Sequence, residues 1–313
     1  MKALVTGADG FVGRWLIEHL EESGDEVWEA PGHGEATHPR RRALDVSDAQ
    51  SVQAAMAWAR PEAIYHLAAV AAGPDTAGDI GRAIDVTVRG TAHLLAAASR
   101  LEQPPTVLIP SSGEVYGAAG AESIDEVATP APVSLYGATK LAQEAIGLAY
   151  HRSGGVRVAV ARAFNHIGPG QREAFAVASL AGQLANGHAM SKRPVDVRVG
   201  NLAARRDFTD VRDVVRAYRL IVAGGHFGEP MNVASGRAFS IREMLDRLVE
   251  ASGLEVEISE DPSRMRPADV PVVQGSSARL RSLTGWEPEI PLDDTIRDIW
   301  ADALVRAASA GGP

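Results

Sequence analysis

Apolar and polar positions along the first half of the chain follow two alternating periods. Short apolar runs of the kind that form buried parallel strands recur at residues 3–5, 27–28, 63–65, 107–109 and 156–161. Between them, apolar residues return at helical spacing, as at Val12, Trp15, Leu16 and Leu20 and over residues 48–58, 80–98 and 136–151. This alternation predicts an α/β fold with a doubly wound, Rossmann-type parallel sheet.

After about residue 163 the alternation becomes irregular, which indicates a smaller C-terminal α/β lobe. Helical patterns cover residues 175–185, 211–223 and 292–306, a strand pattern covers 195–199, and a capping box at Ser240 and Glu243 begins a helix that runs to about residue 251. We expect a dinucleotide-binding domain over residues 1–163, to which residues 211–235 return, and a substrate-binding lobe over residues 164–210 and 236–307. Residues 308–313 are expected to form a flexible tail.

Composition excludes several classes of function. The 313 residues are 45% hydrophobic, enough for a large core, and carry a formal charge of −9, which disfavours a nucleic-acid partner. The absence of cysteine removes disulfides, thiol nucleophiles and cysteine-ligated zinc, and the nine histidines include no HExxH pair, so we expect no metal. No apolar run approaches the ~20 residues that span a bilayer, and the N-terminus lacks the apolar core of a signal peptide. We therefore expect a cytoplasmic protein without a membrane partner.

A glycine-rich segment, Thr6-Gly7-Ala8-Asp9-Gly10-Phe11-Val12-Gly13, follows the first predicted strand and begins the first predicted helix. Its three glycines permit a tight turn, close approach of a pyrophosphate to the backbone, and packing of the helix on the sheet. The helix N-terminus then offers unpaired N–H groups to the phosphates. The segment predicts dinucleotide binding; a purely structural turn is the alternative.

The choice of cofactor depends on the end of the second predicted strand. An NAD enzyme usually has an acidic residue there for the ribose hydroxyls, but Pro31 occupies the expected position and Glu29 is only nearby. Three arginines, Arg40 to Arg42, follow and have the charge to bind a 2′-phosphate, although a solvated basic loop explains them equally well. We expect NADP(H) in preference to NAD(H).

Tyr136 and Lys140 are four residues apart on a predicted helix and therefore share one face. Ser111, Ser112 and Glu114 follow the carboxyl end of a predicted strand, where ligands of parallel sheets gather. A nearby ammonium lowers the pKa of a phenol, and a serine hydroxyl can hold the same substrate oxygen. We interpret these residues as an acid/base set, against the alternative of ordinary helix surface.

Together these motifs resemble the extended short-chain dehydrogenase/reductases over nearly the whole chain. The resemblance implies catalytic roles for Ser112 (Ser111 as second choice), Glu114, Tyr136 and Lys140. It implies that the cofactor is bound by Gly7, Gly10, Phe11, Val12, Gly13, Asp45, Val46, Leu67, Ala68, Ala69, Tyr136 and Lys140. Thr87 and Pro31 depart from the family pattern.

Within that family, the second half looks most like enzymes of GDP-linked 6-deoxy-4-keto sugars, on segments 165–171, 199–202, 205–213 and 261–267. This implies NAD(P)H-dependent reduction of the C4 ketone of a GDP-4-keto-6-deoxy-hexose, to GDP-D-rhamnose or a similar product. Substrate binding is expected from Ser112, Glu114, Asn165, Arg206 and Arg266, with Arg264 behind them and His166 either beside the substrate or structural. Dehydration of GDP-mannose, with Glu114 as base, another NDP-sugar epimerase or dehydratase reaction, and a catalytically inactive NAD(P)-binding sensor remain alternatives.

The resemblance also implies a homodimer. In that family, the helices predicted over residues 80–98 and 136–151 pair with those of a second copy as a four-helix bundle. Leu94, Leu95 and Ala98 on the first helix and Leu141, Ala145, Leu148 and Ala149 on the second are the candidate contacts. Core packing within one copy is the alternative for the same residues.

Overall fold

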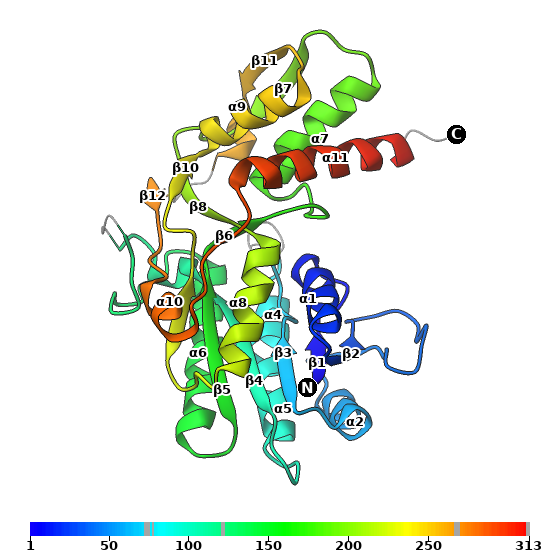
Figure 1. Ribbon diagram of the computed structural model, residues 1–313, viewed down its shortest axis with the longest axis vertical. Helices are drawn as coiled ribbons and strands as arrows, with labels where there is room; N and C mark the ends of the chain where they lie inside the picture. The colour runs from blue at the N-terminus through cyan, green and yellow to red at the C-terminus, as the bar shows by residue number, and fades with distance from the viewer. Residues whose placement is uncertain (72–75, 77, 120–122, 266–269, 311–313) are drawn as a thin grey trace.

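Two lobes make up the protein in the computed structural model, which describes residues 1–71, 76, 78–119, 123–265 and 270–310. The larger lobe contains a six-stranded sheet, and the smaller one contains three helices packed against one another and a two-stranded sheet (Figure 1). The predicted α/β fold with a Rossmann-type sheet is confirmed.

The large sheet is parallel throughout, with its strands in the order β2-β1-β3-β4-β5-β9. The strands are β1 (Lys2–Thr6), β2 (Glu26–Ala30), β3 (Ala63–His66), β4 (Thr106–Ser112), β5 (Arg157–Ala163) and β9 (Pro230–Val233). Their order reverses between β1 and β3, which is where doubly wound sheets bind ligands beyond the carboxyl ends of the strands.

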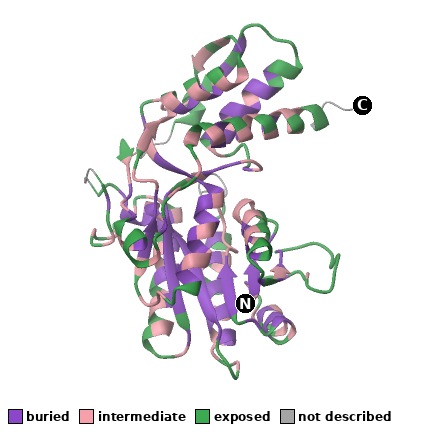
Figure 2. Cartoon of the chain, in the orientation of Figure 1, coloured by how far each residue is buried: buried purple, intermediate pink, exposed green. Residues whose placement is uncertain are grey.

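Helices cover both faces of this sheet, so its strands are buried (Figure 2). One face carries α1 (Phe11–Glu22), α8 (Val211–Ala223) and α10 (Ala278–Thr284). The other carries α2 (Ala49–Ala59), α5 (Gly90–Ala98) and α6 (Leu135–Arg152). Burial on both faces explains why the strand sequences are continuous apolar runs rather than alternating ones.

The smaller lobe packs α7 (Ala176–Ala189), α9 (Ile241–Ser252) and α11 (Leu292–Ala310) around one apolar core. Two strands of this lobe, β7 (Val195–Val199) and β11 (Val256–Glu260), pair in parallel. A second small sheet joins the lobes: β8 (Arg205–Asp210) pairs with β6 (Asn165–Ile167), β10 (Ala238–Ser240) and β12 (Val272–Val273). Short helices η2 (Gly113–Tyr116) and η3 (Pro262–Arg264) complete the connections.

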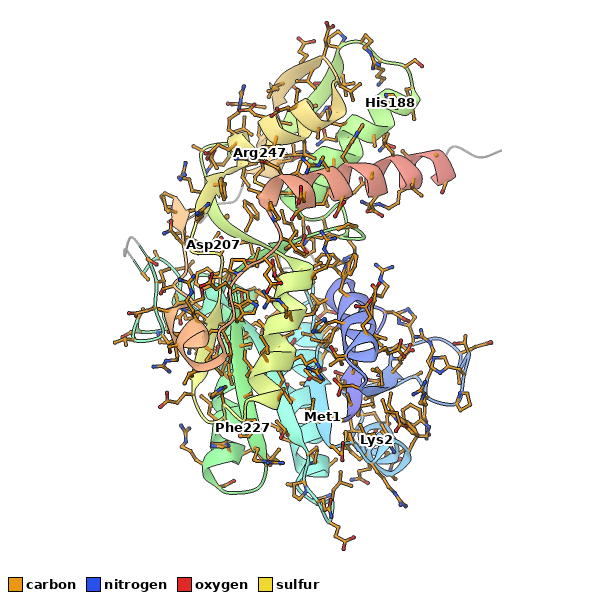
Figure 3. The ribbon with its side chains drawn as sticks, viewed as in Figure 1. Met1, Lys2, His188, Asp207, Phe227 and Arg247 are labelled. Carbon is orange, nitrogen blue, oxygen red and sulfur yellow. The ribbon has the colours of Figure 1, made fainter. Side chains whose placement is uncertain are left out.

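Asp207 on β8 ties the junction together and lies between the lobes in Figure 3. Its buried carboxylate accepts hydrogen bonds from the backbone N–H groups of Ser235 at 2.8 Å, Gly236 at 2.9 Å and Gly275 at 3.2 Å. These donors come from two segments far apart in the sequence, so the Asp207 side chain holds both segments at the junction between the lobes.

Three expectations about elements and boundaries need correction. The helix expected over residues 80–98 is divided into α4 (Ile80–Ala83), a π-helical turn η1 (Ile84–Arg89) and α5. Residues 308–310 continue α11 rather than starting a tail, and residues 311–313 lie outside the described residues. The assignment of 236–307 to the small lobe is wrong for α10, because Leu280 and Trp286 are fully buried in the core beneath α1 and α8.

The expected dimer contacts on α5 are also wrong. Leu94, Leu95 and Ala98 are fully buried among α2 and the sheet within one copy, so they cannot face a second one. Helical periodicity predicts that one face of a helix is buried but does not indicate which surface covers it. Here α2 and the sheet of the same chain cover it.

The described residues contain no helix long and apolar enough to cross a membrane. Across the same residues, no group of three or more His, Cys, Asp or Glu side chains is arranged to hold a metal ion.

Candidate active site

The glycine turn between β1 and α1 leaves no room for side chains. A Cβ on Gly13 would lie 2.5 Å from the carbonyl oxygen of Gly7, and one on Gly7 would lie 2.9 Å from the backbone nitrogen of Ala68. Gly7 also has a φ of +67°, in the left-handed region that favours glycine. The turn therefore lies directly against Leu67 and Ala68, and Ala69 follows them in the half-buried segment after β3.

The N-terminus of α1 fits a dinucleotide pyrophosphate. Its N-cap residue is Gly10, which has no side chain to cap the first turn. The N–H groups at the start of a helix lack partners within the helix, and Phe11, Val12 and Gly13 supply three of them here. Together with the positive end of the helix dipole, such donors suit a phosphate group.

Between the end of β2 and the glycine turn, the Arg41 guanidinium lies between two carboxylates. It forms an ion pair with Glu29 of β2, and its Nη2 lies 2.6 Å from Oδ1 of Asp9 in the glycine turn. Pro31 follows β2 with no polar side-chain atom. Asp45 is exposed beside the buried Val46 and accepts hydrogen bonds from Ser47 that lower its pKa.

Four polar side chains meet where β4 ends and α6 begins. Ser112 accepts a hydrogen bond from the N–H of Glu114 at 3.1 Å, and its hydroxyl lies close enough to the Tyr136 phenol to lower the pKa of that phenol. Ser134 caps α6 through the N–H of Gly137, at 3.0 Å, and donates to Oε2 of Glu114 at 2.6 Å. Since successive strand residues point to opposite faces, Ser112 rather than Ser111 accompanies the tyrosine.

The phenol of Tyr136 is a weaker acid than the sequence indicated. Burial raises its pKa above the ordinary value, the negative charge of Glu114 raises it further, and the nearby Ser112 hydroxyl opposes both. The expected lowering by Lys140 is not observed, because the ammonium is directed to Gln143, with Nζ 2.6 Å from Oε1. The resting site therefore holds a protonated phenol, the form that donates a proton.

Lys140 is almost fully buried on α6, and burial lowers the pKa of its ammonium to about 8, although Glu144 one turn later raises it. Glu144 is itself committed to Arg162 on β5, whose Nη2 lies 2.7 Å from its Oε2. Arg162 also donates to the hydroxyl of Tyr116 at 2.9 Å. A buried ion pair thus joins α6, the helix that carries Tyr136 and Lys140, to β5.

The start of the small lobe is joined to the glycine-turn helix. His166 stacks on Phe11 with ring centroids 6.1 Å apart, and burial lowers the pKa of the imidazole. The indole N–H of Trp15 donates to the carbonyl oxygen of Pro169 at 3.1 Å. Asn165, next to His166, is exposed at the start of β6, in the sheet that joins the lobes.

The arginines expected to bind a diphosphate have different surroundings. Arg206 is half-buried and donates to the backbone carbonyl oxygens of Arg205 at 2.8 Å and Val270 at 2.7 Å. Arg264 contacts α7 through the Ser179 hydroxyl at 3.0 Å. Arg266 lies outside the described residues. Their roles in substrate binding stay predictions.

Sequence reasoning missed two polar residues that complete the site. Ser134 holds Glu114, and Gln143 holds Lys140. A signal for each was present: serine two residues before the tyrosine is a common N-cap, and residue i+3 of a helix lies beside residue i.

Comparison with known proteins places this geometry in a family. The family described as GDP-mannose 4,6 dehydratase matches residues 4–299. A GDP-6-deoxy-D-mannose reductase from Pseudomonas aeruginosa is 37% identical over 304 residues, covering 96% of both chains.

Among solved structures, that of RMD from P. aeruginosa complexed with NADPH superposes with a TM-score of 0.86 at 35% identity, covering 98% of this chain and 100% of that one. UDP-glucose 4-epimerase from Thermus thermophilus in complex with NAD gives 0.84 at 27% identity, covering 97% and 99%. The chain belongs to the GDP-mannose 4,6-dehydratase family, within the extended short-chain dehydrogenase/reductases.

Proposed function

We propose that this protein reduces the C4 ketone of a GDP-4-keto-6-deoxy-hexose, with NADPH as the hydride donor. The observation that carries the proposal is the group of polar side chains at the end of β4 and the start of α6, where Ser112 and Glu114 lie close enough to the Tyr136 phenol to change its pKa and Ser134 donates to Glu114 at 2.6 Å. The 37% identical reductase, named for a GDP-6-deoxy sugar, supports the choice of substrate class.

Each residue has one task in this reaction. A reduced nicotinamide supplies a hydride to the carbonyl carbon, and Tyr136 gives its proton to the carbonyl oxygen, so the ketone becomes an alcohol. Ser112 holds that oxygen, and the ammonium of Lys140 is proposed to bind the ribose of the nicotinamide. We propose that Glu114, which accepts a hydrogen bond from Ser134 at 2.6 Å, also accepts one from a neighbouring sugar hydroxyl.

On the substrate side, we propose that the diphosphate of the nucleotide lies against Arg206 and Arg266, and that Asn165 contacts the sugar. Guanidinium groups suit this task because they donate two parallel hydrogen bonds to phosphate oxygens. The exposed position of Asn165 at the junction between the lobes fits such a contact.

The preference for NADPH rests on the ion cluster at the glycine turn. Arg41 is the cation between Glu29 and Asp9, while Pro31 gives the ribose hydroxyls no acceptor. Arg41→Ala is expected to raise the KM for NADPH about tenfold to hundredfold and to change the KM for NADH little, because charge-assisted contacts to a phosphate contribute this much.

Steady-state kinetics with both cofactors measure this selectivity, and Arg100→Ala is the control, since Arg100 is exposed and lies outside the basic run Arg40 to Arg42. An equal loss with NADPH and NADH would show that Arg41 only holds the turn together.

The function itself is tested by incubating the protein with GDP-4-keto-6-deoxy-mannose and NADPH or NADH while following absorbance at 340 nm. Oxidation of the cofactor supports the reductase. A parallel reaction with GDP-mannose and no added reductant tests the dehydratase, for which the Glu114 carboxylate beside Tyr136 is the specific supporting feature. Conversion there, without reduction of the keto sugar, would make Glu114 the base of an elimination and would reject the reductase.

We also propose a homodimer through α6 and the helical segment α4–η1. On that side Ile80 and Ile84 are 38% and 45% exposed, one helical turn apart, and a second copy would bury both. Sedimentation equilibrium is expected to give about twice the chain mass of 33.0 kDa. A mass of one chain at micromolar concentration would reject the dimer.

A further inference from the structure

We propose that Gln143 is a positioning residue for Lys140, held by a chain of buried hydrogen bonds that reaches back to the strand end before the glycine turn. The inference rests on the proposed function only in giving Lys140 a catalytic task. The links are Lys140 Nζ to Gln143 Oε1 at 2.6 Å, Gln143 Nε2 to Thr91 Oγ1 at 2.8 Å, Thr91 Oγ1 to His66 Nε2 at 2.9 Å and His66 Nδ1 to Thr6 Oγ1 at 2.9 Å.

The chain of hydrogen bonds lies inside the protein and joins four elements. Thr6 is on β1, His66 on β3 and Thr91 on α5, while Gln143 and Lys140 are on α6. The first four side chains are fully buried, and Lys140 is 4% exposed. Buried polar groups are costly unless each finds a partner, so a set that satisfies its members is a rigid unit.

The direction of every hydrogen bond follows from Thr91. Its single hydroxyl proton goes to the carbonyl oxygen of Thr87 at 2.6 Å, so its oxygen can only accept from the other two neighbours. Gln143 must therefore present its NH₂ group to Thr91, which leaves its carbonyl oxygen for the ammonium of Lys140. The reversed amide would set an NH₂ group against the ammonium and a carbonyl oxygen against a hydroxyl with no proton left.

The same argument fixes the tautomer of His66. Its Nε2 must carry the proton that Thr91 accepts, so its Nδ1 accepts from the hydroxyl of Thr6, whose oxygen accepts in turn from the N–H of Ala68 at 3.1 Å. Burial, with Lys140 nearby, lowers the pKa of His66 to about 3, so the ring stays neutral. A neutral ring in one tautomer holds Thr91 without adding a second charge beside the ammonium.

The consequence concerns the geometry of the ammonium. Lysine has a flexible four-carbon side chain, and fixing it during the reaction costs conformational entropy. The Gln143 oxygen fixes Nζ in advance. Because Thr6 precedes Gly7, and Ala68 touches both, the network ties this position to the backbone of the pyrophosphate site.

Three variants and one control test the proposal. Gln143→Met keeps the length of the side chain but removes both hydrogen bonds, Thr91→Val breaks the chain one step away from Lys140, and Thr91→Ser keeps the hydroxyl. Thr106→Val makes the same exchange at another buried threonine, on β4 and outside the network. We expect kcat to fall about tenfold to hundredfold for Gln143→Met and several-fold for Thr91→Val, with recovery in Thr91→Ser and no loss in Thr106→Val.

A measurement independent of turnover separates this proposal from the proposed function. In ¹⁵N NMR spectra of the whole protein, the Lys140 ammonium protons are expected to be protected from exchange with water and to lose that protection in Gln143→Met. His66 is expected to show a protonated Nε2 and a bare Nδ1. If no GDP-sugar is reduced while these signals behave as stated, the proposed function fails and the positioning role stands.

Two results would overturn the positioning role: unchanged kcat and unchanged Lys140 signals in folded Gln143→Met, or equal losses of kcat in Thr91→Val and Thr106→Val. A His66 ring protonated on Nδ1 would overturn the assigned directions and with them the argument for Gln143.

Discussion

Tyr136→Phe is expected to lower kcat for ketone reduction about a thousandfold while leaving the KM for NADPH nearly unchanged. The substitution keeps the aromatic ring and removes only the hydroxyl that donates the proton, and a positioned general acid contributes about a hundredfold to ten-thousandfold. Stopped-flow and steady-state assays of NADPH oxidation measure the loss, and fluorescence titration of NADPH measures binding.

The matched control is Tyr150→Phe, on the same helix and beside a different part of the core. It is expected to keep full activity. More than a tenth of the normal kcat in Tyr136→Phe would show that another group protonates the substrate, and would remove the tyrosine from the mechanism.

The pH dependence of the unsubstituted enzyme follows from the same site. Burial and Glu114 keep the pKa of Tyr136 above its ordinary value, so the phenol stays protonated through the neutral range. The ammonium of Lys140 has a pKa of about 8 and loses its charge above that pH. The kcat/KM for the ketone, which reports the free enzyme, is therefore expected to be level near neutral pH and to fall above about pH 8.

Local spacing is what made the fold, and the placement of Tyr136 and Lys140 on one helix, predictable. The strands β1, β3, β4 and β5 are buried on both faces, so each is a continuous run of apolar residues. Such a run can be recognised from a few consecutive residues of the sequence. Tyr136 and Lys140 are one helical turn apart, so their shared face needs no knowledge of the rest of the chain.

Long-range contacts were not predictable in this way. Gln143 meets Thr91 across 52 residues and Glu144 meets Arg162 across 18, and no periodic signal links such positions. The pKa of Tyr136 was misjudged for the same reason, since it depends on burial and on where the Lys140 ammonium points. Leu94 and Leu95 show a further limit: a helical apolar stripe is the same whether the covering surface is the chain's own sheet or a second copy.

Breaking the buried ion pair behind α6 is expected to have the largest effect on stability. Glu144 and Arg162 have side chains 2% and 6% exposed, and the carboxylate receives hydrogen bonds from both Nε and Nη2 of the guanidinium. Glu144→Leu would leave a buried guanidinium whose remaining partner is the Tyr116 hydroxyl. We expect it to lower the free energy of unfolding by about 3–5 kcal/mol, as removal of one partner from a buried pair does.

Replacing both Glu144 and Arg162 distinguishes the attraction between the two charges from the cost of burying them. Glu144→Leu combined with Arg162→Met exchanges two desolvated charges for apolar side chains of similar length, and it is expected to recover most of the lost stability. Urea unfolding of the unsubstituted protein, the two single variants and the double variant gives the coupling energy between Glu144 and Arg162. The control is Arg242→Met at the Arg242–Asp246 pair, where both side chains are more than half exposed. It should lower the free energy of unfolding by less than about 1 kcal/mol. A loss below that value for Glu144→Leu would mean that water reaches the guanidinium, so the pair would not be what keeps α6, and with it Lys140, in place against β5.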